Sequence, residues 1–420
     1  MGAIGSGRNR RLLAAVALVV AGIFVGVVPA SADGGHPAGA SYVSPHGSAG
    51  AAGRNCGTAT FWSINAAVAA ASAGGTVVVC PGTYAEDVLV PKSLTLLGQN
   101  ATIDATNLEN GIQVVASNVS VSGFTLENAN GEGLLVGIDS LADIGLLPES
   151  GPVISNVTID HVKAINDNKG FNGTEASNCK YPGDCGGGIH LQVTEHSTVS
   201  NSQTSGNADG ILLTDDYGPN GYNVIDGNLV TDNTTECGIV LPSHNGDALS
   251  DTGARQPLQG GVFDNVIRNN VVLRNGTALA PPQFGGVGGS GGGVGIFGSF
   301  PGTAAYDNVV EGNYLEGNGL AGVVMHAHHP GGEDINGNQI IDNTFATNNV
   351  MGDPFDGGVS DFQTTAIAIY SVPTATLTIT GNTIRSNAIG IFLTQPVTAL
   401  GLDNNKYENV GTPVVVQPAN

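Results

Sequence analysis

Short runs of alternating apolar and polar residues recur along most of this chain, and turns rich in asparagine and glycine separate them. Alternation with a period of two predicts half-buried β-strands, and the Asn/Gly steps predict tight turns. One full unit lies in the segment 308–329, as three strand-like runs with two turns between them: Asn308-Val-Val, Gly312-Asn313, Tyr314-Leu, Gly317-Asn318-Gly319 and Gly322-Val-Val-Met. The chain is therefore predicted to repeat a unit of three short strands.

The central turn of this unit recurs along the chain, at Gly123, His161, Asn201, Asn228, Asn270, Asn313, Asn338 and Asn382. The shortest spacings are 25 and 27 residues, and Gly/Pro/Ser-rich insertions such as 243–261 and 277–293 account for the longer ones. A period of this size indicates a solenoid, whose units bury their apolar faces by stacking. Leucine-rich repeats have a similar period, but they need regular leucines and a helical segment in each unit, and both are missing from this sequence.

The first residues are typical of an export signal. Three arginines precede the apolar run 12–28, and Ala30-Ser31-Ala32 offers a small-residue cleavage site. Residues 1–32 are thus predicted to be a signal peptide; an uncleaved anchor is the alternative, since the run is only slightly shorter than a membrane span. Residues 33–54 are predicted to form a disordered lead-in, and residues 55–420 a single domain of stacked coils.

Charge limits the partners of the exported chain. Without residues 1–32 it has ten basic and 35 acidic residues, a net charge of −25. Such a surface repels nucleic acid and anionic membranes, so no nucleic acid and, after signal cleavage, no membrane is expected as a partner. A polyuronate would also be repelled unless cations bridged it, which makes a divalent metal ion such as calcium the candidate cofactor. A neutral polysaccharide would meet no such barrier.

All five cysteines follow the predicted signal peptide, where disulfides are permitted. The pairings local in sequence are Cys56 with Cys80 and Cys179 with Cys185. Cys237 is left over and directly precedes a strand-like run, which favours a small buried apolar role over a reactive thiol.

Residues 60–73 are predicted to form a helix that Ser63 caps and Gly74-Gly75 ends. Five apolar residues lie near one face of it, namely Trp62, Ile64, Ala67, Val68 and Ala71. The strand-like runs that follow are Gly75-Thr-Val-Val-Val, Pro81-Gly-Thr-Tyr84, residues 88–90, Lys92, Leu94-Thr-Leu and Gly98. Together this stretch resembles the opening of right-handed parallel β-helix proteins of the pectin-lyase-like group, in which the helix plugs one end of the coil.

This resemblance, extended by the coil pattern, covers about residues 56–417. It implies an all-β, single-stranded right-handed parallel β-helix with a short N-terminal helical cap. About ten coils are expected between residues 76 and 417, with less than a tenth of the chain in α-helix. The segments 238–244 and 321–330 resemble a subgroup of secreted bacterial β-helix repeat proteins, so the chain is expected to be secreted.

The third strands can be aligned on a leading glycine, such as Gly210, Gly238 and Gly322. Equivalent positions in a parallel coil stack about 4.8 Å apart. Six residues beyond the leading glycine the sequence has Thr194, Asp216, His244, Ser299 and His328, and around them lie His190, Asp215, Ser243, His326 and His329. Asp216 and His244 are therefore expected to be neighbours, with His328 about two strand spacings away.

Five of the nine histidines fall at this edge. We predict Asp215, Asp216, His244 and His328 as catalytic residues. We predict His190, Ser243, His326 and His329 as substrate contacts. The alternative is a purely structural role, because Asp, Ser and His are ordinary residues at strand ends.

Thr214-Asp215-Asp216 resembles the paired aspartates of β-helix polygalacturonases, but the Gly-His-Gly and Arg-x-Lys elements of that family have no match in this sequence. The aligned third strands carry no Arg or Lys, which argues against a pectate lyase with a basic catalytic residue. A histidine base, as in the epimerases and some lyases of the group, suits His244 or His328. Gly352-Asp-Pro-Phe355 resembles the Asp-Pro-His motif of alginate epimerases, with Phe355 in place of the histidine.

The leading hypothesis is a secreted protein that binds an extracellular polysaccharide and cleaves or modifies it as a hydrolase, lyase or epimerase. One alternative is a non-catalytic carbohydrate-binding or surface protein. The other is a copper-handling protein, since the β-helix protein that assists copper loading of nitrous oxide reductase has this fold. In that case His326, His328 and His329 could bind the ion.

Overall fold

The computed structural model describes residues 39–49, 51–138, 152–168, 186–280, 286–353 and 363–418. The chain divides into two compact units, Met1–Pro37 and Ala38–Asn420, and the described residues all belong to the second. The predicted signal peptide lies outside them, as do Cys179 and Cys185. Within them, no helix is both long and apolar enough to cross a membrane.

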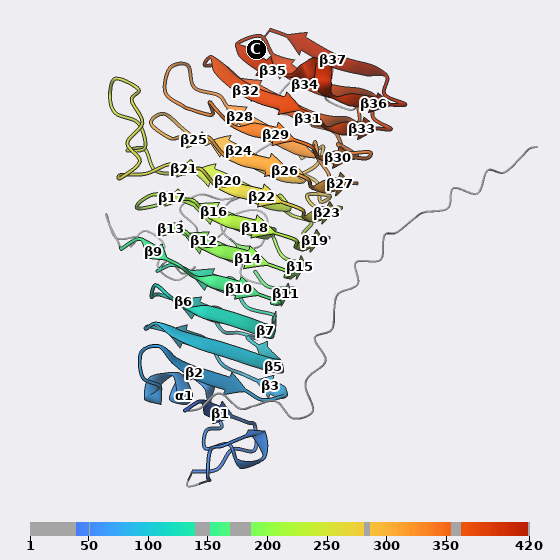
Figure 1. Ribbon diagram of the computed structural model, residues 1–420. Coiled ribbons are helices and arrows are strands. Elements are labelled where there is room, and N and C mark those ends of the chain that lie inside the picture. The colour runs from blue at the N-terminus through green and yellow to red at the C-terminus, as the bar shows by residue number, and fades with distance from the viewer. Residues whose placement is uncertain are drawn as a thin grey trace, which may run out of the picture. The chain divides into compact units, whose positions relative to one another are not determined.

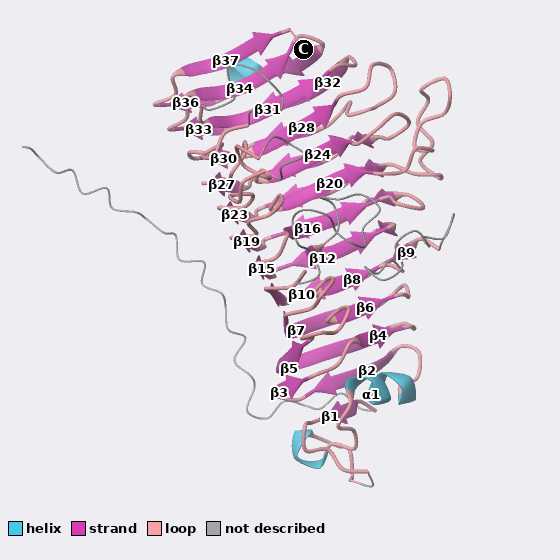
Figure 2. Cartoon of the chain, turned by 180° about the vertical axis from the view of Figure 1, so that it is seen from behind, coloured by secondary structure: helices cyan, strands magenta, loops and turns pink. Residues whose placement is uncertain are grey.

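Parallel strands stack coil upon coil through this unit (Figure 1). The third strands of the coils form one parallel sheet of eleven described strands, which Figure 2 shows from the other side. They are β4 (Val88–Val90), β6 (Ile112–Val114), β8 (Leu134–Val136), β12 (Gly187–Gln192), β16 (Asp209–Thr214), β20 (Ile239–Ser243), β24 (Val294–Gly298), β28 (Val323–Ala327), β31 (Thr365–Ser371), β34 (Ile389–Thr394) and β37 (Thr412–Gln417). The right-handed parallel β-helix is confirmed, with one coil for each of these strands.

Two more ladders of short strands make the other walls of the coil. In the first coils these walls are formed instead by four strands: β2 (Gly75–Val79), β3 (Gly82–Tyr84), β5 (Leu94–Asp104) and β7 (Ser120–Glu127). One ladder is β10 (Thr158–Asp160), β14 (Thr198–Ser200), β18 (Val224–Asp226), β22 (Val266–Arg268), β26 (Val309–Glu311), β29 (Gln339–Ile341), β32 (Ala375–Thr380) and β35 (Val397–Leu400). The other is β11 (Lys163–Ile165), β15 (Gln203–Ser205), β19 (Leu229–Thr231), β23 (Val271–Leu273), β27 (Tyr314–Glu316), β30 (Thr344–Phe345), β33 (Thr383–Arg385) and β36 (Lys406–Glu408). A small parallel sheet joins β9 (Ile154–Ser155), β13 (Thr194–Glu195), β17 (Asn220–Gly221), β21 (Val262–Phe263) and β25 (Ala305–Tyr306).

The core is a set of apolar rows that run along the stack. In the first ladder Ile225, Ile267 and Val310 are paired in register and fully buried. The residues on either side of each point outward. Because side chains alternate across a strand, a slip of one residue would expose the whole row, so the alternation in the sequence fixes the register.

A row of buried asparagines also runs along the stack. It shows which residues occupy the central turn of each coil, and these differ in part from the predicted ones. The ladder is Ser202, Asn228, Asn270, Asn313, Asn343, Asn382 and Asn405; each asparagine Oδ1 accepts the backbone N–H of the preceding member. The predicted anchor Asn338 is wrong, because it follows Asn308 in a neighbouring ladder. The steps around Asn343 are 30 and 39 residues.

Three other anchors were displaced by one residue. These anchors have positive φ angles and lie one residue before the position that belongs to the asparagine ladder in their coils; they are Gly123, His161 and Asn201. Asparagine and glycine occur at several corners of each coil, so their presence in the sequence does not identify the corner.

The N-terminal end of the stack is covered by α1 (Ile64–Ala70), which buries Ile64, Ala67 and Val68. The Ser63 hydroxyl oxygen accepts the N–H of Ala66, and the Glu86 carboxylate accepts the N–H of Ile64. These contacts supply acceptors for the first N–H groups of the helix. The cap helix is confirmed, but it is shorter than the predicted 60–73, because it begins after the Ser63 cap and ends at Ala70.

Two predictions about this end are wrong. Trp62 is 60% exposed and lies off the buried face of the helix. Residues 41–43, in the predicted disordered lead-in 33–54, form β1 (Ser41–Val43), which pairs in parallel with β2. Tyr42 and Val43 are buried there, and this burial offsets the entropy of ordering the segment.

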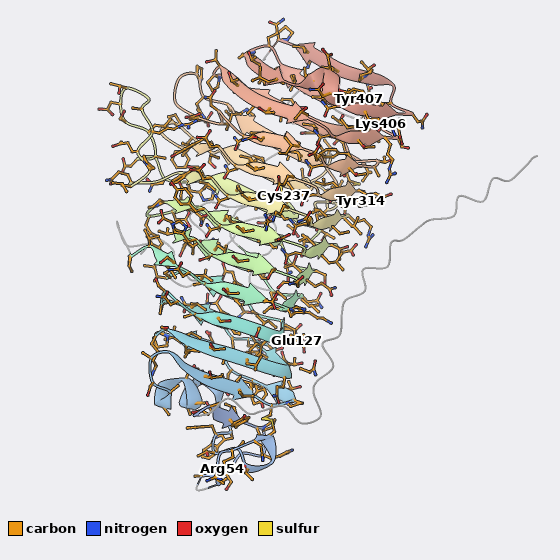
Figure 3. The ribbon with its side chains drawn as sticks, viewed as in Figure 1. Arg54, Glu127, Cys237, Tyr314, Lys406 and Tyr407 are labelled. Carbon is orange, nitrogen blue, oxygen red and sulfur yellow. A yellow bond between two sulfur atoms is a disulfide. The ribbon has the colours of Figure 1, made fainter. Side chains whose placement is uncertain are left out.

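The predicted disulfide between Cys56 and Cys80 is confirmed. It ties the short 3-10 helix η1 (Cys56–Thr58) to the end of β2 across a sequence separation of 24 residues. A loop of this size corresponds to about 3 kcal/mol in the chain-entropy estimate. Cys237 is buried beside Leu212 and Val240, as expected of a small apolar residue (Figure 3).

Candidate functional site

The strand pairing confirms the predicted alignment of the third strands. Ile211 pairs with Ile239, Ile239 with Val294, and Val294 with Val323. The residues that follow β16, β20 and β28 are therefore brought to one edge of the sheet.

Asp216 and His244 are in contact at this edge. The carboxylate Oδ1 of Asp216 lies 3.1 Å from Nδ1 of His244. Its Oδ2 accepts a hydrogen bond of 2.7 Å from the Thr214 hydroxyl and one of 3.0 Å from Nε2 of Gln192. Both side chains are almost wholly buried. The carboxylate is thus held by three side chains from three consecutive coils.

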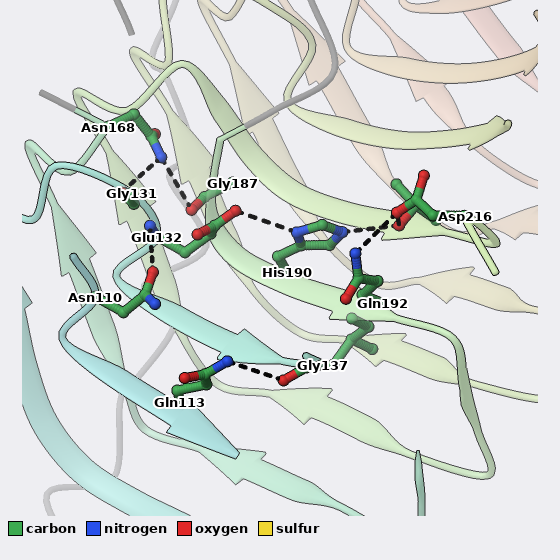
Figure 4. A network of polar contacts seen from close by, with 12 residues as sticks. Asn110, Gln113, Gly131, Glu132, Gly137, Asn168, Gly187, His190, Gln192 and Asp216 are labelled. Carbon is green, nitrogen blue, oxygen red and sulfur yellow. Dashed lines mark hydrogen bonds and ion pairs between the residues drawn. The ribbon is translucent and has the colours of Figure 1, made fainter. Parts of the chain in front are cut away.

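The network continues toward the N-terminal coils (Figure 4). His190 on β12 contacts the Thr214 hydroxyl through Nε2 at 2.9 Å and Oε1 of Glu132 through Nδ1 at 3.3 Å. Oε2 of Glu132 is buried and has no hydrogen-bond partner among the described residues. A connected chain of buried polar groups therefore crosses four coils, from Glu132 to His244.

Glu132, Gln192 and Thr214 were missed at the sequence level. The available signal was their position: Gln192 and Thr214 are paired in register, and Glu132 directly precedes the leading glycine of β8.

The surroundings of Asp216 favour its ionised form. Burial opposes ionisation of Asp216, but the hydrogen bond from His244 and the electrostatic interaction with the His244 and His190 rings hold its pKa below the usual value. The ionised carboxylate only accepts, so the Thr214 hydroxyl and Nδ1 of His244 both donate to it. With Nδ1 as the donor, the neutral form of His244 carries its lone pair on Nε2, in the orientation known from carboxylate–histidine pairs in catalytic and metal sites.

Asp215 has a different environment, although it is the adjacent residue. Its carboxylate accepts four hydrogen bonds, from the Ser243 hydroxyl (2.8 Å) and from the N–H groups of His244 (2.6 Å), Asn245 (3.2 Å) and Gly261 (2.6 Å). Burial raises the pKa of Asp215 to about 6, and the bonds from His244 and Ser243 oppose this shift. Asp215 and Ser243 thus anchor both ends of the 244–261 loop behind His244.

His326 and His328 form a second group, at the end of β28. Nδ1 of His326 lies 3.1 Å from Nε2 of His328. The His326 ring sits between the rings of Phe297 and Tyr370 in the adjacent coils, with centroids 4.9 and 5.7 Å away. His326 is partly exposed and His328 is exposed, so each ring has solvent on one side and crowded protein atoms on the other.

This crowding affects the protonation of both rings. Burial lowers the pKa of His326, although the nearby charge of Asp353 acts in the opposite direction. Desolvation, followed by the adjacent imidazole of His326, lowers the pKa of His328 to about 4. Both rings are therefore neutral at pH 7, the form in which imidazole binds metal ions.

His329 forms a third group. Its Nδ1 contacts Oε1 of Glu333 at 2.9 Å, and its backbone N–H donates to Oε2 of the same carboxylate at 2.6 Å. Glu333 thereby fixes the turn that follows the histidine pair. In the Gly352-Asp-Pro-Phe motif, Asp353 is buried and Phe355 lies outside the described residues.

The donor set at the histidine pair fits a metal ion in part. In the described part of the chain no group of three or more His, Cys, Asp or Glu side chains could hold a metal ion, so the candidate calcium site has no identified ligands there. Two nitrogens that each lie about 2.0 Å from one ion are separated by about 3.3 Å when the angle at the ion is near tetrahedral. Nδ1 of His326 and Nε2 of His328 lie 3.1 Å apart, within hydrogen-bond distance and close to that separation.

Residues 110–365 match the sequence profile of a family described as periplasmic copper-binding protein (NosD). No curated protein matches the chain. Among solved structures, the A-module of the mannuronan C-5 epimerase AlgE4 from Azotobacter vinelandii is 17% identical, with a TM-score of 0.48 over 84% of this chain and 92% of that chain.

Pectate lyase Pel9A is 15% identical, with a TM-score of 0.40 over 73% of this chain and 75% of that chain. An alginate lyase from Paenibacillus sp. str. FPU-7 is 13% identical, with a TM-score of 0.38 over 85% and 95%. Similarities of this size say nothing about the reaction or the substrate of this chain.

Proposed function

The chain belongs to the NosD family, and on this premise we propose that it is an exported copper-binding protein whose metal site contains His326 and His328. The family description, periplasmic copper-binding protein, supports both the metal and the periplasmic location. We further propose that residues 1–32 act as the export signal. The observation that carries the proposal is the separation of 3.1 Å between two neutral imidazole nitrogens at the surface.

Copper, when bound, would contribute a borderline or soft cation for which imidazole nitrogen is a suitable ligand. The protein contributes the rest. Nδ1 of His326 and Nε2 of His328 would be the ligand atoms, and the rings of Phe297 and Tyr370 limit the rotation of His326. Because both imidazoles are already neutral, little proton release opposes binding at pH 7. The acidic surface also raises the local concentration of cations.

The test is a copper titration of protein without a histidine tag, with Cu⁺ under reducing conditions and with Cu²⁺ under air. We expect one copper ion per chain. The affinity for copper should be at least about 100-fold weaker in His326→Ala and in His328→Ala. The reason is that losing a ligand should cost more than the 10- to 100-fold loss that follows removal of an outer-shell partner. His161→Ala is the control, because His161 is exposed and lies on another wall of the coil. Unchanged affinity in the double variant would refute the site.

A second candidate function is the binding and modification of an extracellular polysaccharide, by hydrolysis, elimination or epimerisation. The specific observation in its favour is the Asp216–His244 contact, because a carboxylate that orients an imidazole prepares Nε2 to take a proton. It ranks second because His244 is only 3% exposed, which restricts the approach of a sugar.

Its test is a panel of neutral and uronate polysaccharides, assayed for reducing ends and for the absorbance of unsaturated uronates. If the wild-type protein is active, we expect His244→Ala and Asp216→Asn to reduce the rate at least about 100-fold. His196→Ala should keep full activity, because His196 is exposed and stacks on Tyr222, outside the Asp216–His244 network. Binding without turnover would instead support the non-catalytic alternative, and neither binding nor turnover on any polymer would count against this candidate.

A further inference from the structure

The two ends of the coil stack differ. At the N-terminal end α1 covers the first coil, and β1 pairs with the outer edge of β2. At the C-terminal end the last coil consists of β35, the 3-10 helix η4 (Leu402–Asn404), β36 and β37. Within the described residues no element covers this coil, whose strands lie at the C-terminal end of the stack in Figures 1 and 2.

The apolar core is open at this end. Leu393 on β34 and Val416 on β37 are paired in one inward-facing row, and their exposed fractions are 2% and 54%. Val414 is likewise only half-buried, whereas Ile391, its partner on β34, is fully buried. The last coil therefore presents the cross-section of the core to solvent, as an exposed apolar surface of the kind that marks interfaces.

Strand edges surround this apolar surface. β35, β36 and β37 pair on one side with β32, β33 and β34, and no described strand pairs with their other side. Their backbone groups on that side form a template for another strand. On β37 the N–H of Thr412 donates to Ala388, and the next residue, Pro413, has no N–H to offer a further strand.

We propose that this end docks a second copy of the chain, end to end, to form a dimer with two-fold symmetry. The end of a second copy has the same cross-section, so it covers the same apolar rows and strand edges. Because α1 blocks the N-terminal end, head-to-tail growth is prevented and the assembly closes at two subunits.

The charges on β36 are complementary under this symmetry. Lys406 and Glu408 flank Tyr407 on the outward face of the strand, where they form an ion pair within one chain (Figure 3 labels Lys406 and Tyr407). A two-fold axis near Tyr407 reverses the strand direction. Lys406 then lies beside Glu408 of the partner subunit, and Glu408 lies beside Lys406 of the partner subunit. Such cross-strand pairs of opposite charge stabilise a sheet, and like charges destabilise it.

The test is sedimentation equilibrium of the full chain at about 1 to 100 µM, the range of moderately stable association. We expect a dimer for the wild-type protein and a monomer for Val416→Lys, which places a charge on the apolar surface. Lys406→Glu should weaken association at least about tenfold, because it places like charges side by side across the axis. The double exchange Lys406→Glu with Glu408→Lys should restore the wild-type affinity.

Circular dichroism and thermal unfolding of each variant establish that it is folded. Lys406 and Glu408 are exposed or half-exposed, so their exchange leaves the core unchanged. A wild-type protein that remains monomeric at the highest concentration would overturn the proposal. So would a double exchange that dimerises no better than Lys406→Glu alone.

Discussion

Replacing Asp215 by alanine is expected to lower the free energy of unfolding by about 4 kcal/mol, because it leaves several buried donors without an acceptor and each such donor costs about 1–3 kcal/mol. The four donors are the Ser243 hydroxyl and the N–H groups of His244, Asn245 and Gly261. Their losses do not add fully, since the loop can relax toward water. Urea denaturation followed by circular dichroism measures the change.

Asp247→Ala is the matched control, because Asp247 lies in the same loop and is exposed. It should change stability by less than about 0.5 kcal/mol. Asp215→Asn keeps the shape of the side chain but turns one acceptor into a donor, so an intermediate loss is expected. A loss below about 1 kcal/mol in Asp215→Ala would contradict the anchoring role, since it would leave at most one donor unsatisfied. Asp215 would then return as a candidate for catalysis.

The second large effect is expected at the asparagine ladder. Asn343→Ala should lower the free energy of unfolding by about 3 kcal/mol, because it removes a side chain whose buried partners cannot turn to water. Asn343 Oδ1 accepts from the backbone N–H and from Nδ2 of Asn313, and its own Nδ2 donates to the carbonyl of Val310 and to Oδ1 of Asn382.

Thr344→Ala is the control for this change, because Thr344 is the next residue and points outward from β30. The same denaturation experiment should give less than about 1 kcal/mol for it. Equal losses in the two variants would show that the ladder adds nothing beyond ordinary strand propensity.

The sequence by itself determined the stacking of the chain and much of its register. Alternation with a period of two allows only one face of each strand to be buried, and the leading glycine marks the same point in successive third strands. For this reason Asp216 and His244 could be expected as neighbours, and they are in contact. The disulfide was predictable for a similar reason, since Cys56 and Cys80 lie on either side of a short helix that must cover the first coil.

Only the tertiary structure decided what each polar residue does. Asp215 and Asp216 are adjacent and chemically identical, but one faces four donors from the 244–261 loop and the other faces His244. The partners belong to other coils, tens of residues away, and nothing in the local pattern fixes which direction a side chain takes at a strand end.

The direction of a side chain at a strand end also decides which of the predicted histidines contact one another. The sequence groups His326, His328 and His329, whereas the structure pairs the first two and gives the third to Glu333. Likewise, Asn338 and Asn343 look equivalent in sequence, and only the path of the coil assigns them to different ladders. Apolar periodicity determines where the backbone lies, while the partner of each polar group depends on corners and insertions that have no periodicity.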